Sequence, residues 1–509
     1  MEKNEKSSPK TVEETTKFLS EGITAHEISR APSIETRRQI QKVLLIDIPI
    51  MDEVDSPEEE ILNAYWKAQS ILSPPGYKDH MEATKYSRGL LTIGKVLQEK
   101  GVPTRYISVN DVTLDELDEA ILWADMIGIA GSCTAFYPIM KAVSDRARLK
   151  NNEAVIILGG NHVTATDHQT LTNIPSADVI VRKEGEITVP ELVDNSISLQ
   201  DVEGISFRNA QNRIIRNKDR SRILGRDVPI PAYDLLPHHP QNYSYRLEAT
   251  RGCPYKCAFC IDGVFTDHKI TRITIEKTME ELLFLKDRLA PGAHLHFIDS
   301  IFTLNKKRML HLLDEMRKHS LREHFSFSCD IRAKHADREM VAAMEEAGFS
   351  QVLIGLEDPN DEVLSKVGKG VRVQEDIETA SLFKRHSGIA VTGYWVIGLP
   401  GSTHETLRRT IAAGRDFLQN GVLDNIDCAM FVPLPGTPIF EDPEQYGIEL
   451  LGDEWGARYL RCQFDRAVYR NINGLNEIQI AKYYKLFVDT ILQEYLKKLD
   501  MTLEELLNS

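Results

Sequence analysis

The spacing of apolar residues along the chain predicts alternating strands and helices. Val43–Ile48 is a short run that is apolar except for Asp47, which is typical of a buried parallel strand. Tyr86–Lys100 carries apolar residues at helical spacing, and Gly101 marks its end. Strands that alternate with helices predict a doubly wound parallel sheet. The remaining strands expected in this series are Thr104–Val109, Met126–Ala130, Ala154–Leu158 and Asp178–Val181.

A second alternating series follows a short connection. Val202–Asn217 predicts a hairpin, and Asp227–Pro240, with four prolines, predicts a linker. Residues 242–440 then hold six strand-like runs separated by helices. One helix is expected over Thr403–Asn420, opened by the capping box Ser402-x-x-Glu405. The six strands are expected at Tyr245–Ala249, His294–Phe297, Phe325–Cys329, Gln351–Leu356, Ala390–Ile397 and Asn425–Val432.

These patterns divide the chain into a series of expected parts. The last of them contains a helix expected over Leu475–Leu496, preceded by aromatic residues that could line a substrate pocket or belong to a helix core. Cys462 in the same part is interpreted as a core residue or a second thiol for radical chemistry. The expected parts are an N-terminal extension (1–38), a Rossmann-like domain (39–200), a hairpin and linker (201–241), a barrel (242–440) and a mainly helical segment (441–509).

Composition narrows the class of protein. Hydrophobic residues make up 42% of the chain and charged residues 27%, as in soluble globular proteins. The net charge of −15 argues against nucleic-acid binding, which needs clustered Lys and Arg. No apolar run approaches ~18 residues, so no membrane span is expected, and the polar N-terminus is not that of a signal peptide. The seven cysteines do not form a secreted disulfide framework, and a cytoplasmic location is expected.

Three cysteines form the most informative cluster of the sequence. Cys253, Cys257 and Cys260 have C-x3-C-x2-C spacing directly after a predicted strand, and Phe259 precedes the last of them. Three thiolates this close can hold three irons of a 4Fe–4S cluster, and the fourth iron is left open to a non-protein ligand. A zinc knuckle or a disulfide pair is the alternative. Zinc would require a fourth ligand, and no nearby Cys or paired His supplies one.

This spacing, with an aromatic residue at Phe259, resembles the signature of the radical S-adenosylmethionine (SAM) superfamily. In that superfamily, SAM chelates the open iron, and its reductive cleavage yields a 5′-deoxyadenosyl radical. The resemblance implies a partial TIM-like barrel with its site at the C-terminal ends of the strands. It also implies an electron donor such as flavodoxin or ferredoxin, and a small-molecule or peptide substrate.

Five residues at the predicted strand ends are candidates for binding SAM. By the resemblance, Glu357 and Arg332 contact its ribose and carboxylate, Asp299 lies near its amino group, and Leu399 packs on its adenine. Ser328, at the end of the third strand, and Phe259, in the cysteine loop, are further candidates. Carboxylates suit an ammonium group and a diol, and guanidinium suits a carboxylate. The alternative for each charged residue is a helix cap or a place on the solvated rim.

Glycine-rich turns close three strands of the first series. They read Gly131-Ser132-Cys133-Thr134, Gly159-Gly160-Asn161-His162 and Glu184-Gly185-Glu186. Such turns are either ordinary tight connections or places where a ligand approaches the backbone. The order of strands with these turns resembles the cobalamin-binding domain found upstream of many radical SAM domains. That resemblance implies cobalamin contacts from four residues, Ser132, Thr134, Gly159 and Gly160.

The sequence lacks one motif of some cobalamin proteins. No Asp-x-His-x-x-Gly occurs, so none of the 15 His residues sits in the motif that supplies a lower cobalt ligand. The leading hypothesis is a cobalamin-dependent radical SAM methyltransferase that acts on an unreactive carbon. The first alternative is radical dehydration, cyclisation or rearrangement with the Rossmann-like domain as scaffold. The second is a non-enzymatic module held together by a cluster or by zinc.

Overall fold

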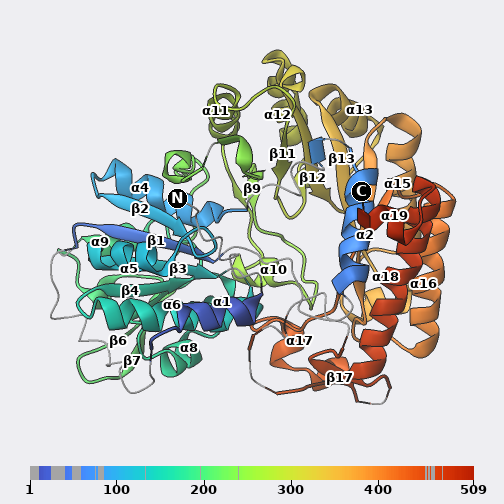
Figure 1. The fold of residues 1–509 in the computed structure, drawn as a ribbon. Helices are drawn as coiled ribbons and strands as arrows, with labels where there is room; N and C mark the ends of the chain where they lie inside the picture. Colours follow the sequence, from blue (N-terminus) through green and yellow to red (C-terminus); the bar gives the residue numbers. More distant parts are fainter. Residues whose placement is uncertain are drawn as a thin grey trace. The chain divides into compact units, whose positions relative to one another are not determined.

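The computed structural model describes residues 11–23, 40–48, 59–74, 76–77, 85–131, 133–194, 196–238, 240–452, 455–456, 459, 465–472 and 474–508. The chain forms two compact units, which are considered separately (Figure 1). Unit 1 comprises the described residues within 1–53, 85–239 and 454–459. Unit 2 comprises those within 54–84, 240–453 and 460–509. No described helix combines the length and apolar character needed to cross a lipid bilayer.

Unit 1 is built on a seven-stranded sheet in the order β2-β1-β3-β4-β5-β6-β7. The first five strands along the chain are parallel, and the last two are antiparallel. The order changes direction between β1 and β3, and ligands bind at such a point in doubly wound sheets. The predicted hairpin is confirmed and extends this sheet. The strands are β1 (Val43–Ile48), β2 (Thr104–Ser108), β3 (Met126–Gly131), β4 (Val155–Gly159), β5 (Val179–Val181), β6 (Ile205–Arg208) and β7 (Ile214–Arg216).

The helices of unit 1 pack on this sheet and on one another. The N-terminal helix α1 (Val12–Leu19) buries Val12 and Leu19, and Arg146 donates to the Leu19 carbonyl at 3.3 Å. The segment expected as a peripheral extension therefore contains a packed helix. A capping box of Thr113 and Glu116 opens α5 (Leu114–Trp123). The other helices are α4 (Arg88–Glu99), α5 (Leu114–Trp123), α6 (Tyr137–Lys150), α7 (Asn161–Ala165), α8 (Asp167–Asn173) and α9 (Thr188–Val193).

Unit 2 contains a second sheet of six strands in the order β15-β14-β13-β12-β11-β8. Every neighbouring pair is parallel, as expected for a partial βα barrel. The predicted strands all occur, with bounds that differ by a few residues at most. They are β8 (Tyr245–Leu247), β11 (Ala293–Phe297), β12 (Phe325–Ile331), β13 (Phe349–Glu357), β14 (Ala390–Ile397) and β15 (Asn425–Met430).

Helices between these strands cover the outer face of the second sheet (Figure 1). Two short hairpins complete the unit, β9 (Thr250–Arg251) with β10 (Thr271–Arg272), and β16 (Ile448–Leu450) with β17 (Tyr469–Asn471). The helices are α10 (Ile261–Phe265), α11 (Ile275–Lys286), α12 (Lys306–Lys318), α13 (Arg338–Ala347), α14 (Asp361–Lys366), α15 (Val373–His386), α16 (His404–Gln419), α17 (Pro438–Glu441), α18 (Glu477–Leu499) and α19 (Leu503–Asn508).

The two faces of the second sheet differ in polarity. On the outer face, the rings of Phe297, Phe327 and Phe349 pack together under the helices, and Trp395 packs on Phe417 of α16. The residues that alternate with them face the interior of the barrel, and most are polar. We call this inward surface the lumen face. Its central residues are Arg246, His296, Ser328, Asp330, Tyr394 and Asp427.

A segment from between the first two strands of the chain folds into unit 2. The helix α2 (Glu59–Leu72) packs on α18, and Tyr65 donates a 2.6 Å hydrogen bond to the carbonyl of Ile426 in β15. Leu62, Tyr65 and Ala68 are fully buried there. The sequence-based division keeps these residues within 39–200. The structure differs because the apolar side of α2 is covered by elements far along the chain.

The start of α16 differs from its expected capping box. Thr403 is the N-cap, and its hydroxyl accepts a hydrogen bond from the Thr406 amide at 3.1 Å. The predicted box at Ser402-x-x-Glu405 is therefore wrong by one residue. Ser402 is instead buried in the turn that precedes the helix. The predicted helix over Leu475–Leu496 is confirmed as α18, whereas Cys462 lies outside the described residues.

Candidate functional site

The loop that carries the three cysteines connects β9 to α10 in unit 2. It begins at Gly252, whose φ of +96° suits glycine because it lies in the left-handed region. The Ala258 amide donates to the Val367 carbonyl at 2.9 Å, and the Ile439 amide donates to the Ala258 carbonyl at 3.3 Å. Two other segments of unit 2 thus fix the middle of the loop.

The thiols of Cys253, Cys257 and Cys260 are free and partly accessible. Burial raises the pKa of the Cys260 thiol to about 12, so its ionised form requires a strongly positive partner such as iron. Among the described residues, no three Cys, His, Asp or Glu side chains converge closely enough to hold a single metal ion. Three thiolates can ligate three irons of a 4Fe–4S cluster, whereas a mononuclear zinc site takes four ligands.

Arg332, at the end of β12, lies against this loop. Its guanidinium is 3.8 Å from the Cys257 Sγ and 3.9 Å from the centre of the Tyr255 ring. It also donates to the Lys369 carbonyl. The Tyr255 hydroxyl in turn lies 2.6 Å from Nε2 of His335. The predicted Arg332 is therefore brought to the cysteine loop, where a fixed cation suits a ligand carboxylate.

Glu357 closes β13 in an unusual backbone conformation. Its φ is +64°, and the strand register shifts between Gly355 and Glu357. Its carboxylate forms a buried ion pair with Lys369. A non-glycine residue at positive φ is often found where a side chain must be aimed at a functional site. Sequence reasoning missed Lys369, although the glycines at positive φ on either side of it were a usable signal.

Asp299 is fully buried behind the cysteine loop. Its carboxylate accepts hydrogen bonds from the Ala249 amide at 2.9 Å and from the Thr250 hydroxyl at 2.6 Å. Burial raises the pKa of this carboxyl to about 6. The carboxylate thus holds the strand that leads into the loop, and its contact with the SAM amino group stays a prediction.

The other three SAM candidates lie in different settings. Ser328 is on the lumen face, 2.8 Å from Nε2 of His294 and 2.7 Å from Nδ1 of His296. Leu399 is fully buried in the turn after β14. Phe259 is partly accessible in the cysteine loop. Their contacts with SAM stay predictions.

In unit 1, two glycine-rich strand ends approach each other closely. Gly160 has a φ of +120°, and a Cβ atom there would lie 2.4 Å from the Gly131 carbonyl oxygen. Only glycine fits such a contact, so these strand ends form a rim at which backbone lies directly against backbone. Gly159 and Thr134 belong to the same two strand ends, whereas Ser132 lies outside the described residues. This rim is at the edge where a doubly wound sheet binds its ligand.

His162 provides an unused polar atom beside this rim. Its Nδ1 lies 3.1 Å from the Thr134 hydroxyl, and its ring contacts those of Tyr137 and Trp455. The buried Nε2 has no hydrogen-bond partner in the described chain. Burial lowers the pKa of His162 to about 3, so the ring is neutral. A neutral, buried ring nitrogen suits a ligand atom or a metal, which fits a cobalamin site. Nothing in the pattern of residues predicted that Trp455 would lie here.

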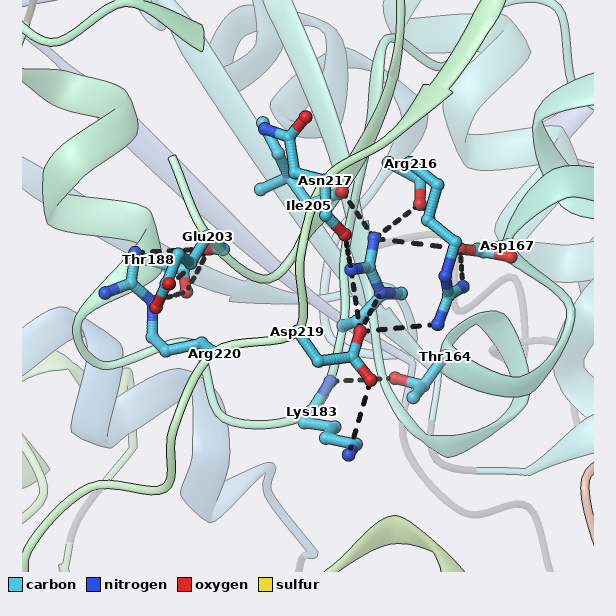
Figure 2. Close-up of polar contacts among 12 residues, drawn as sticks. Thr164, Asp167, Lys183, Thr188, Glu203, Ile205, Arg216, Asn217, Asp219 and Arg220 are labelled. Carbon is cyan, nitrogen blue, oxygen red and sulfur yellow. Dashed lines mark hydrogen bonds and ion pairs between the residues drawn. The ribbon is translucent and has the colours of Figure 1, made fainter. Parts of the chain in front are cut away.

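A charged network holds the turn after β5 near this rim. The Asp219 carboxylate forms ion pairs with Arg182, Arg216 and Lys183 (Figure 2). The Lys183 backbone amide donates a hydrogen bond to the Thr164 hydroxyl of α7 at 3.0 Å. Arg182 also donates to the carbonyl of Ile205 in β6. The antiparallel hairpin is thereby fastened to the parallel strands. The network fixes the start of the Glu184-Gly185-Glu186 turn relative to α7.

Two protein families match the chain in the places that these sites occupy. The model of the B12 binding domain matches residues 78–193, and that of the radical SAM superfamily matches residues 247–413. The uncharacterized methyltransferase PH0819 of Pyrococcus horikoshii is 30% identical over 329 residues, which cover 62% of this chain and 69% of that protein. The anaerobic magnesium-protoporphyrin IX monomethyl ester cyclase of Rubrivivax gelatinosus is 26% identical, over 65% of this chain and 61% of the cyclase.

A solved structure shares the fold across most of the chain. The radical SAM methyltransferase TsrM from Kitasatospora setae, with cobalamin and a 4Fe–4S cluster bound, superposes with a TM-score of 0.61. The alignment covers 88% of this chain and 85% of TsrM at 15% identity. The expected fold class, a Rossmann-like cobalamin-binding domain before a partial radical SAM barrel, is confirmed.

Proposed function

Because the chain belongs to the family of cobalamin-dependent radical SAM enzymes, we propose that it transfers a methyl group from SAM to an unactivated carbon atom. Its cofactors are a 4Fe–4S cluster, SAM and cobalamin. The relative from P. horikoshii is named a methyltransferase, as is the bacteriochlorophyllide d C-12(1)-methyltransferase of Chlorobaculum tepidum, which is 24% identical over 59% of this chain.

One observation carries the proposal: each unit supplies the residues that one cofactor needs. In unit 2, Cys253, Cys257 and Cys260 would hold the cluster, and Arg332 and Glu357 would orient SAM beside it. In unit 1, the glycine rim at Gly131 and Gly160 would lie against the corrin ring of cobalamin. When bound, the cluster supplies the electron that cleaves SAM, and cobalamin carries the methyl group.

Further parts of the proposal concern the surroundings of the enzyme. The electron would come from a small donor such as flavodoxin or ferredoxin, and the substrate would be a small molecule or a peptide. We place the enzyme in the reducing cytoplasm, because such a compartment preserves free thiols. The six cysteines of the described chain are thiols rather than disulfides, which supports this placement.

The test measures two products of SAM without knowledge of the substrate. Anaerobically reconstituted enzyme is reduced with SAM that carries a trideuterated methyl group, with and without hydroxocobalamin. We expect 5′-deoxyadenosine in both samples, and S-adenosylhomocysteine only where cobalamin is present. A metabolite extract added to the complete mixture should then yield a product that carries the labelled methyl group.

Two results would reject methyl transfer. If 5′-deoxyadenosine forms but S-adenosylhomocysteine does not depend on cobalamin, the enzyme performs the non-methylating chemistry of the alternative hypothesis. The cyclase among its relatives gives that alternative a specific basis. If neither product forms in protein with a full cluster, the assignment of the SAM site itself fails.

A further inference from the structure

The lumen face of unit 2 is closed at one end by the α2 segment. A Cβ atom at Gly76 would lie 2.4 Å from the Ser326 hydroxyl oxygen and 3.4 Å from the His294 Cβ. The Tyr77 ring packs edge-on against His294, with ring centres 5.4 Å apart. Both His294 and Ser326 stand at the N-terminal ends of their strands. Gly76 and Tyr77 therefore lie against the N-terminal end of the lumen face, whereas Arg332 and Glu357 lie at the C-terminal ends of their strands.

Charged residues from both edges of the second sheet meet inside the lumen. Burial raises the pKa of Tyr77, the carboxylates Asp427 and Asp330 raise it further, and Arg246 lowers it. Asp427 belongs to β15 and Arg246 to β8, the two edge strands. Charges on both edge strands therefore act on the Tyr77 hydroxyl, which requires the sheet to curl around a shared interior.

Histidine and serine side chains connect the wall of the lumen to Asp330. The Ser326 hydroxyl lies 2.8 Å from Nδ1 of His294, and the Ser328 hydroxyl lies 2.8 Å from its Nε2. Burial lowers the pKa of His294 to about 3. The Ser328 oxygen also lies 2.7 Å from Nδ1 of His296. Nε2 of His296 is 3.8 Å from Oδ2 of Asp330. This chain of contacts holds Asp330 through His296 of the neighbouring strand β11.

Asp330 itself keeps an unused acceptor. Its Oδ1 is buried and receives no hydrogen bond in the described chain, while 31% of the side chain remains accessible. The outward neighbours Cys329 and Ile331 are buried, so the accessible part of Asp330 faces the lumen. In the described chain this carboxylate accepts no hydrogen bond, and its accessible part, outside the buried Oδ1, can accept one from a ligand in the lumen.

We propose that the lumen binds a substrate that carries an amino group, and that Asp330 is the acceptor for that group. Besides His296, which lies 3.8 Å from Asp330, the central lumen face holds two carboxylates, Asp330 and Asp427, and one guanidinium, Arg246, so an ammonium group is favoured over a carboxylate. A hydrocarbon would leave the polar side chains of the lumen without partners. The inference rests on the proposed function, because it names the substrate class of the same site.

The test compares three probes of similar size that differ in charge. Phenethylamine, 2-phenylethanol and 3-phenylpropionate are titrated into the holoenzyme under anaerobic conditions, and binding is followed by saturation-transfer NMR. We expect the amine to bind in preference to the alcohol and the acid. In Asp330→Asn the affinity for the amine should fall roughly tenfold or more, because a charge-assisted hydrogen bond is lost. Asp330→Glu should restore the preference for the amine.

Asp314→Asn serves as the matched control, because Asp314 lies on the outside of unit 2 and pairs with Arg317 and Lys318. Cluster and cobalamin contents show whether each variant has folded. If Asp330→Asn fails this check, Asp427→Asn gives the same comparison from a neighbouring wall. Equal amine affinity in the variant, preference for the alcohol or the acid, or no amine binding by the parent enzyme would each overturn the proposal. Failure of methyl transfer would instead appear as absent cobalamin-dependent S-adenosylhomocysteine, which is measured without any probe.

Discussion

Units 1 and 2 both consist of parallel strands followed by helices, yet they place their polar groups differently. In unit 1 all six residues of β1 are buried, and even Asp47 is satisfied internally by the Ser87 amide and the Tyr106 hydroxyl. The candidate ligand groups stand only at the strand ends. In unit 2 the outer face is apolar, whereas the lumen face carries charged and polar side chains along the length of the strands.

The difference follows from how each sheet is covered. A doubly wound sheet has helices on both faces, so a ligand can reach it only at an edge. A curled sheet has helices on one face and encloses the other, so the enclosed face can bind along its whole depth. Unit 1 is therefore suited to a broad cofactor at a rim, and unit 2 to a cluster at the mouth of a pocket.

The largest effect should come from removing the three thiols of the cysteine loop, because this change acts on the cofactor site of unit 2 and not on that of unit 1. Replacing Cys253, Cys257 and Cys260 together by Ala should abolish cluster binding and SAM cleavage, because no other described thiol lies on that loop. Iron content and 5′-deoxyadenosine measure the effect. Cys329→Ala, on the outer face of β12, is the matched control and should keep both. SAM cleavage by the triple variant would disprove the cluster assignment.

Gly160→Ala tests the rim of unit 1. The added Cβ would meet the Gly131 carbonyl, so we expect cobalamin retention after desalting to be lost and the stability of unit 1 to fall by about 1–3 kcal/mol. Gly101→Ala is the control, because Gly101 also has a positive φ but no atom within 4 Å of the added Cβ. Absorbance of bound cobalamin and urea unfolding give the two readouts. Full retention in Gly160→Ala would exclude this rim as the corrin site.

Glu357→Ala tests the strand-end acceptor of unit 2. SAM affinity should fall roughly ten- to hundredfold, since a charge-assisted hydrogen bond contributes about 1.5–3 kcal/mol. Calorimetric titration of SAM into cluster-loaded protein measures the change. Glu362→Ala, whose exposed side chain pairs with Arg409, should bind SAM as the parent does. Unchanged SAM affinity together with a lower free energy of unfolding would show that Glu357 serves only as the counterion of Lys369.

Asp358→Asn tests a smaller effect within unit 2. Burial raises the pKa of the Asp358 carboxyl to about 7, above its ordinary value of 3.8. The folded state therefore favours the protonated form, and this contribution to stability is lost as pH rises through about 7. Stability should fall by about 1.4 kcal/mol per pH unit up to about pH 7 and then level off, so unfolding by urea at pH 6 and pH 8 should show a difference of about 1.4 kcal/mol that the variant lacks.

The control for this pH effect is Asp416→Asn, because Asp416 is exposed on α16. It should keep the pH dependence of the parent. If Asp358→Asn keeps it as well, the buried carboxyl is ionised at both pH values, and the observed dependence has another source.

Local signals in the sequence predicted the strands well, and contacts distant in sequence account for what they missed. Ala390–Ile397 was predictable because its apolar and β-branched residues form one uninterrupted run. The positions of Cys257 and Arg332 followed from strand-end placement. The partner of α2 did not, because nothing in Glu59–Leu72 indicates which distant helix covers its apolar side. Trp455 beside His162 was missed for the same reason.

The placement of α2 has a consequence for synthesis of the protein. Tyr65 and its acceptor Ile426 are 361 residues apart. A ribosome that adds about 5–20 residues per second needs roughly 20–70 s to cover that distance. During this time the apolar side of α2 has no native partner, and chaperones that bind exposed apolar segments can reach it. Unit 2 therefore begins to emerge before most of unit 1 and is completed only after it, so expression at a lower temperature with added chaperones favours the native protein.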